Sequence, residues 1–193
     1  MKESEIVRGH FQASINLKIK VQKQCSSEIV EMAKVLSDCL KKGKKIFFCG
    51  NGGSAADAQH LAAEFIVRLR KNSKRMALPA LALSTNASVL TACSNDFGFE
   101  EVYARQLEAL GQKGDCLIAI STSGESSNVN KACRLAKKKG LIVISLLGGR
   151  GGTQARLSDR KIIVPSFDTP RVQEVHITIG HILCDLIERR LFS

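Results

Sequence analysis

Short, almost purely apolar segments alternate along the chain with longer segments in which apolar residues recur every three or four positions. The apolar segments predict strands at 45–49, 78–84, 115–121, 141–148 and 161–166. The amphipathic segments predict helices near 54–70, 99–110, 127–139 and 170–191. Continuous apolar strands separated by helices are typical of a parallel sheet covered on both faces. With right-handed crossovers, the pattern predicts an α/β fold: a doubly wound, mostly parallel sheet with helices on both faces.

The N-terminal segment, residues 1–43, has a different pattern. No proline occurs between residues 5 and 42, and apolar residues follow one another at helical spacing at Cys25, Ile29, Met32, Leu36 and Cys39. The pattern predicts one long helix, or two shorter ones, ending at Gly43. It allows packing against a partner subunit, which we expect, and equally packing on the same domain. The whole chain, 1–193, is expected to form one domain, because its length suits a single full core.

Composition narrows the class of protein. Hydrophobic residues make up 44% and charged residues 24%, which is ordinary for a globular domain. No apolar run approaches the ~20 residues of a membrane span, and the N-terminus lacks the apolar core of a signal peptide. We therefore expect a cytoplasmic protein without a membrane partner. The chain has seven cysteines, and their odd number without C-x-x-C spacing favours buried free thiols over disulfides or a thiolate metal site.

The net charge of +11 raises the question of an anionic partner. The basic residues are dispersed, and the aromatic residues, eight Phe and one Tyr, are not interleaved with them. This distribution argues against a stacking platform for single-stranded nucleic acid. We expect no nucleic-acid partner and a basic surface that steers phosphorylated substrates.

A glycine-rich loop follows the first predicted strand, at 50–54. Glycines allow close approach of the backbone to a ligand, and the start of the next helix is a natural anion site. We predict Ser54 as the N-cap of that helix, with Asp57 completing a capping box. The loop also fits the dinucleotide fingerprint, but the next strand ends at 84–86 without an acidic residue, which excludes NAD. No Walker A lysine follows the glycines, which excludes a nucleotide P-loop.

A second polar loop follows the strand at 115–121. It reads STSGESS and stands directly before a predicted helix. Hydroxyls and helix N–H groups bind phosphate without a metal or a fixed charge. One such loop would be no more than a serine-rich turn, but two at the binding edge of the sheet favour a phosphoester ligand.

His60 and Glu64 lie four residues apart on the helix that follows the first loop, so they share one face of it. Both residue types are zinc ligands. They also belong to a polar stripe with Asp57 and Arg68, and such stripes are common on surface helices. From the local pattern alone, the surface stripe is the favoured interpretation.

Four separated motifs occur in a fixed order: CGNGGSAADAQHLAAEF at 49–65, SND at 94–96, AISTSGESSNV at 119–129 and RVQEVHITIGHILCDLIE at 171–188. Together they resemble the sugar isomerase (SIS) domain family and, within it, the phosphoheptose isomerase family, over nearly the whole chain. The resemblance implies an aldose–ketose isomerase that converts sedoheptulose 7-phosphate to D-glycero-D-manno-heptose 7-phosphate through an enediol(ate). This is the first step toward ADP-heptose and the lipopolysaccharide core. It also implies a homotetramer with active sites between subunits.

The resemblance implies roles for particular residues. The substrate phosphate would be surrounded by Ser54, Ser121, Thr122, Ser123 and Ser126. The sugar would be lined by Asn51, Gly52, Gly53, Asn95 and Asp96, with further contacts from Glu64 and Gln173. One zinc ion per subunit would be held by His60, Glu64, Gln173 and His181. Glu64 and His181 would also be the acid–base pair, whereas His176 has no family role and is interpreted as structural.

Two alternatives use the same fold. A non-enzymatic relative binds the DnaA replication initiator, and the C-terminal CDLIERRLF is similar to the end of that protein. This chain keeps His60, Glu64 and both polar loops, which favours the isomerase. Sugar-phosphate-sensing regulators carry an additional DNA-binding domain, for which residues 1–43 are too short.

Overall fold

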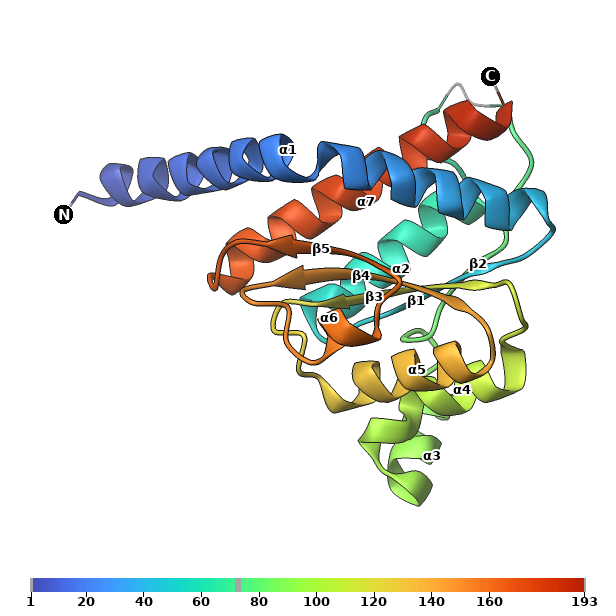
Figure 1. Ribbon diagram of the computed structural model, residues 1–193. Coiled ribbons are helices and arrows are strands. Elements are labelled where there is room, and N and C mark those ends of the chain that lie inside the picture. The colour runs from blue at the N-terminus through green and yellow to red at the C-terminus, as the bar shows by residue number, and fades with distance from the viewer. Residues whose placement is uncertain (1, 72–73, 193) are drawn as a thin grey trace.

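Five parallel strands form one sheet in the computed structural model, which describes residues 2–71 and 74–192 (Figure 1). The strands are β1 Ile46–Cys49, β2 Ala80–Ala82, β3 Cys116–Ser121, β4 Ile142–Gly148 and β5 Arg160–Val164. Their order across the sheet is β2-β1-β3-β4-β5, and every neighbouring pair is parallel. The predicted doubly wound parallel sheet is therefore confirmed.

Helices cover both faces of this sheet (Figure 1). On one face, a single apolar core is shared by α1 Glu3–Lys41, α2 Gly53–Ile66 and α7 Thr169–Phe192. On the other face, a second core is shared by α3 Ala87–Phe97, α4 Val102–Leu110 and α5 Ser127–Lys138. The 3-10 turn η1 Phe99–Glu101 joins α3 to α4, and the short helix α6 Gln154–Leu157 packs beside α5. Because both faces are covered, β3 is buried at all six positions, as its continuous apolar run predicts.

The N-terminal segment is one continuous helix of 39 residues, which settles the choice left by the sequence pattern. It ends just before Gly43, whose φ of +67° suits the left-handed conformation common after helices. Its second half packs on α7 and buries Met32, Ala33 and Leu36. Its first half extends beyond the sheet (Figure 1). This half exposes apolar side chains.

Helix α3 was not among the predicted helices. Asn86 is its N-cap, and the Asn86 side chain accepts a hydrogen bond from the Val89 backbone N–H at 3.1 Å. Only Cys93 of this helix is buried, so α3 has no regular apolar stripe to reveal it.

All seven cysteines are free thiols, as expected from their spacing, and six of them are buried. Across the described ranges, no helix is both long enough and apolar enough to cross a membrane.

Candidate functional site

The carboxyl ends of β1 and β3 form the switch point of the sheet. From β1 the chain leads to β2 on one side, and from β3 it leads to β4 on the other. Open α/β sheets bind ligands at such a point, outside the carboxyl ends of the strands. The two polar loops predicted to hold an anion lie there, one after each of these strands.

Hydrogen bonds join the first loop to the start of α5 and to α4. The side-chain amides of Asn51 and Asn128 exchange hydrogen bonds of 2.9 and 2.8 Å. The Tyr103 hydroxyl donates to the Gly50 carbonyl oxygen at 2.5 Å and lies 3.2 Å from Asn51 Oδ1. Burial raises the pKa of Tyr103 to about 12, so the phenol keeps its proton at neutral pH. Asn51 is thus held in place by side chains that the sequence did not single out, Tyr103 and Asn128.

The first loop differs from the prediction at its helix start. Gly52, with φ +55°, is the N-cap of α2, and the helix begins at Gly53. The predicted capping box is therefore wrong: Ser54 is buried inside the first turn, and Asp57 makes no cap. With Gly52 as the cap, the helix begins two residues earlier than it would with Ser54 as the cap. Gly53 lies close to the Gln173 side chain, since a Cβ there would lie 2.5 Å from Gln173 Nε2.

The second loop is folded by its own hydroxyls. Ser121 Oγ accepts a hydrogen bond from the Gly124 N–H at 3.0 Å and lies 3.4 Å from Ser126 Oγ. Ser123 Oγ accepts from the Glu125 N–H at 3.2 Å. Gly124 has φ +70°, and a Cβ there would lie 2.1 Å from the Gly151 carbonyl oxygen. The serine loop, with the partly exposed Thr122, therefore packs on the glycine loop after β4 and ends at α5.

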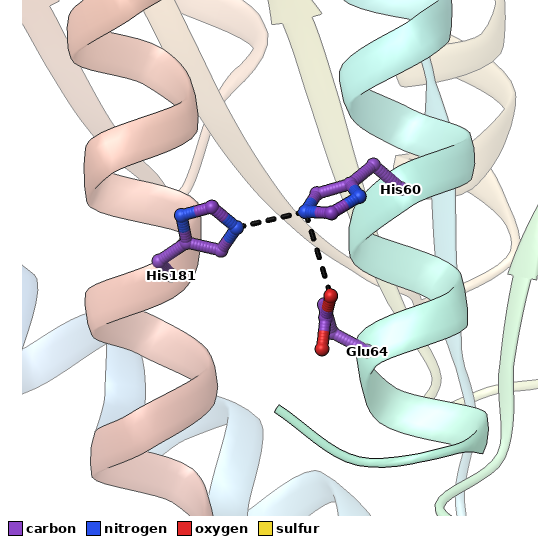
Figure 2. Close-up of side chains that lie close together, drawn as sticks. All are labelled: His60, Glu64 and His181. Carbon is purple, nitrogen blue, oxygen red and sulfur yellow. Dashed lines mark hydrogen bonds and ion pairs between the residues drawn. The ribbon is translucent and has the colours of Figure 1, made fainter. Parts of the chain in front are cut away.

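The two histidines and the glutamate come together between α2 and α7 (Figure 2). His60 Nε2 lies 2.8 Å from His181 Nε2, and their rings meet edge to face at 79°. Glu64 Oε1 lies 3.5 Å from the same His60 nitrogen. One donor atom from each of the three residues lies within 4.8 Å of the others, the only such group of three or more potential metal ligands within the described ranges. The polar stripe on α2 therefore faces α7 at His60 and Glu64, although the His60 side chain remains 48% exposed.

Small residues let α2 and α7 approach side by side. Gly53 lies against Gln173, and Leu61 lies against Gly180, where a Cβ would come within 2.5 Å of Leu61 Cδ2. The earlier residue of α2 contacts the earlier residue of α7 and the later contacts the later, so the two helices run parallel. This register places His181 opposite His60.

Gln173 lies away from the histidine pair. It precedes His181 by eight residues on α7, which corresponds to about 12 Å along the helix axis. Its side chain instead contacts the first turn of α2, beside the glycine loop.

Asn95 and Asp96 lie near the end of α3, on the far face of the sheet from α2 and α7 (Figure 1). Both are exposed, and the Asn95 amide donates to Asp96 Oδ1 at 2.8 Å. Within one subunit, therefore, the structure does not bring them to the histidine pair.

Two further ionisable residues lie on α7 and α2, the helices that carry the histidine pair. His176 is fully buried, and one ring nitrogen lies 3.1 Å from the Leu147 carbonyl oxygen, which supports its structural interpretation. Burial lowers the pKa of His176 to about 4. Burial also raises the pKa of Asp57 to about 6, and Asp57 Oδ2 has no hydrogen-bond partner in the described structure. In the sequence, the position of Asp57 one turn before His60 could have indicated that its carboxyl lies near the histidine pair. The prediction that Asp57 caps the helix assigned it another role.

Comparison with known proteins gives a consistent picture. A family model of the SIS domain matches residues 10–148. The chain is 47% identical to a phosphoheptose isomerase of Clostridium acetobutylicum over 97% of this chain and 95% of that protein. It is 56% identical to one of Nitratiruptor sp. over 88% and 89%. The solved structure of phosphoheptose isomerase GmhA from Neisseria gonorrhoeae is similar, with a TM-score of 0.92, 42% identity and coverage of 97% and 100%.

Proposed function

We propose that this chain, which belongs to the phosphoheptose isomerase family of SIS-domain proteins, interconverts sedoheptulose 7-phosphate and D-glycero-D-manno-heptose 7-phosphate. The observation that carries the proposal is the convergence of His60, Glu64 and His181 between α7 and α2, the helix that follows the first phosphate loop. In this proposal the reaction is the first step of ADP-heptose synthesis for the lipopolysaccharide core. The enzyme is proposed to act in the cytoplasm.

The two loops are proposed to bind the substrate. Their glycine backbone, their hydroxyls and the first turns of α2 and α5 suit a phosphate dianion. The proposed phosphate contacts are Ser54, Ser121, Thr122, Ser123 and Ser126. The proposed sugar contacts are Asn51, Gly52, Gly53, Glu64, Asn95, Asp96 and Gln173. Apart from Glu64, these residues position the sugar and take no part in the proton transfer.

The chemistry is a proton transfer between neighbouring carbons. Glu64, as the base, removes a proton from C1 of the ketose, and the C1–H electrons form the C1–C2 double bond. The π electrons of the C2 carbonyl move onto O2, which takes a proton to give the enediol. The proton then returns at C2, and O1 becomes the aldehyde oxygen as its own proton leaves. His181 moves the proton between O1 and O2. A partly buried carboxylate and an imidazole are suited to these roles near neutral pH.

A zinc ion fits the donor set. Two imidazole nitrogens and one carboxylate oxygen are donors that catalytic zinc sites use, and they leave a position open. His60, Glu64 and His181 would hold the ion. Gln173, proposed as a fourth and weaker ligand, would have to turn its side chain from the first turn of α2 toward His181. When bound, zinc supplies positive charge that polarises the carbonyl oxygen.

The active sites are proposed to lie between the subunits of a homotetramer. Two features of the single chain support this. The first half of α1 exposes a run of apolar side chains, and Asn95 and Asp96 lie apart from the histidine pair they would serve.

The alternative, a non-enzymatic protein that binds DnaA, is not favoured. Such a protein would not require the convergence of His60, Glu64 and His181. The curated relatives reported above carry the name of the isomerase.

The test is an isomerisation assay with sedoheptulose 7-phosphate on purified protein, before and after treatment with a chelator. We expect turnover that is lost on chelation and restored by zinc. DnaA binding without turnover would support the alternative, and full activity in rigorously metal-free protein would remove zinc from the proposal.

A further inference from the structure

A buried arginine closes the end of α2. Arg75 lies between α2 and β2, and its side chain is only 1% exposed. Arg75 Nη2 donates to the carbonyl oxygen of Glu64 at 2.6 Å, and Nη1 donates to that of Phe65 at 2.8 Å. The last four carbonyls of a helix have no partner within the helix and carry partial negative charge. Arg75 donates to two of them, of which that of Phe65 also accepts from the Leu78 N–H at 3.1 Å, and it places its positive charge at that end.

The same arginine ties α2 to α7. Arg75 Nε donates to Glu188 Oε1 at 2.6 Å, and this oxygen also accepts from the Leu69 N–H at 3.2 Å. Glu188 lies on α7, seven residues and so two turns after His181, on the same face of the helix. We refer to Arg75 and Glu188 as the α2–α7 clamp.

The clamp lies next to the proposed active site and acts on its backbone. Glu64, a proposed ligand and base, is itself one of the residues whose carbonyl Arg75 holds. The contact between His60 and His181 depends on the relative position of the two helices. Metal and catalytic sites need their groups within about 0.5 Å of the working geometry, which is set by such supporting contacts.

We propose that Arg75 is a positioning residue: through the main chain of Glu64 and through Glu188, it sets α2 against α7 so that His60, Glu64 and His181 converge. The inference rests on the proposed function, because it assigns the clamp to the zinc and isomerase site. Arginine suits the role because its planar fork makes four hydrogen bonds here, to Glu188 and to the carbonyls of 64, 65 and 76. A lysine carries the same charge without the fork.

The first test compares Arg75→Met with Arg75→Lys. Loss of supporting contacts around a metal site typically weakens metal binding by about 10–100-fold. We expect this loss of zinc affinity for Arg75→Met and a smaller loss for Arg75→Lys, measured by competition with a chromophoric chelator. The kcat for sedoheptulose 7-phosphate should fall in the same order, while KM changes less than about threefold, because the phosphate loops are untouched.

A second variant separates positioning from stability. In Arg75→Met/Glu188→Leu both charges are gone, so no unpaired carboxylate is left buried, and the midpoint of urea unfolding should recover relative to Arg75→Met. The carbonyls of Glu64 and Phe65 still lack the arginine, so zinc affinity and kcat should stay low. A purely structural role predicts that all three recover together.

Lys45→Met is the matched control. Lys45 Nζ lies 3.0 Å from Asp115 Oδ2, and the Asp115 side chain is fully buried, but this pair lies at the amino ends of β1 and β3. The variant should lower stability and leave zinc affinity unchanged.

The outcomes separate the two proposals. Wild-type protein that binds zinc and isomerises the heptose, together with Arg75 variants whose zinc affinity and kcat are unchanged, would overturn the positioning role alone. Wild-type protein that does neither would overturn the proposed function and this inference with it.

Discussion

Glu64 has two proposed roles, base and metal ligand, and a single substitution distinguishes them. Glu64→Gln keeps the size of the side chain and removes the carboxylate. We expect turnover to be abolished while substrate binding and the oligomer stay intact, because the loops and α1 are unchanged. Zinc affinity, measured on the same variant, falls if the carboxylate is a ligand and is retained if it is only the base. Turnover near the wild-type rate would rule out Glu64 as base, and Glu100→Gln, on exposed η1, is the charge-matched control.

His176 makes the stability of the fold depend on pH. Its pKa is about 4 in the folded protein, depressed by burial from 6.5, so between these values the unfolded chain binds more protons. Stability therefore falls as the pH is lowered through this window. We expect zinc-free protein to lose about 2 kcal/mol from this residue between pH 7 and pH 5.

Urea unfolding at both pH values, compared with His176→Gln, measures this contribution. The variant has no titrating ring at this position and should show a correspondingly smaller loss. Equal losses in the two proteins would contradict a buried neutral His176.

At the scale of elements, the sheet could be predicted because buried parallel strands are apolar at every position. The 115–121 and 141–148 runs match β3 and β4 almost residue for residue. The apolar runs do not encode strand order, which depends on how the crossover helices pack. The start of α2 was missed because a positive φ at Gly52 is a property of the folded loop.

The site was predictable only in part from local pattern. His60 and Glu64 are neighbours on one helix, whereas His181 is 121 residues away from His60. Their meeting depends on the register of α2 on α7, which is set by close contacts such as that of Gly180 with Leu61. Resemblance supplied the partner residue, because the polar stripe alone is compatible with a surface helix.

The serine loop gives a prediction at this scale. Gly124→Ala adds a Cβ that would lie 2.1 Å from the Gly151 carbonyl oxygen. The serine loop must therefore move away from the loop that follows β4. We expect KM for the sugar phosphate to rise about tenfold or more, because the hydroxyls that position the phosphate move with it. Steady-state kinetics on the folded variant measure the change.

Gly43→Ala is the matched control for that change. Gly43 has a similar φ of +67°, but a Cβ there meets nothing within 4 Å, and it lies at the end of α1. It should cost about 1 kcal/mol of stability from the left-handed backbone and leave KM unchanged. A similar KM in both variants would contradict the binding role of the serine loop.

At the scale of the whole molecule, the first half of α1 carries an exposed apolar stripe, although Arg171 of α7 donates to the His10 carbonyl oxygen at 2.8 Å. Val7, Phe11, Ile15 and Ile19 recur every four residues, and Phe11 is 68% exposed. The stripe continues into a groove of about 410 Å³ between α1 and α7, lined mainly by apolar side chains including Ile15, Ile19 and Ile179. A stripe and a groove of this kind suit helix packing between subunits.

The stripe leads to a test of the proposed tetramer. Phe11→Glu/Ile15→Glu places two charges on this surface, and burying them between subunits is costly. We expect light scattering to give a smaller assembly than for the wild type, with the helical content of each chain retained. If the active sites lie between subunits, turnover falls together with the assembly. Leu110→Glu, at an exposed apolar residue that ends α4, is the control and should keep the wild-type mass. An unchanged mass for the double variant would contradict packing through α1, and full activity in a dissociated chain would place the active site within one subunit.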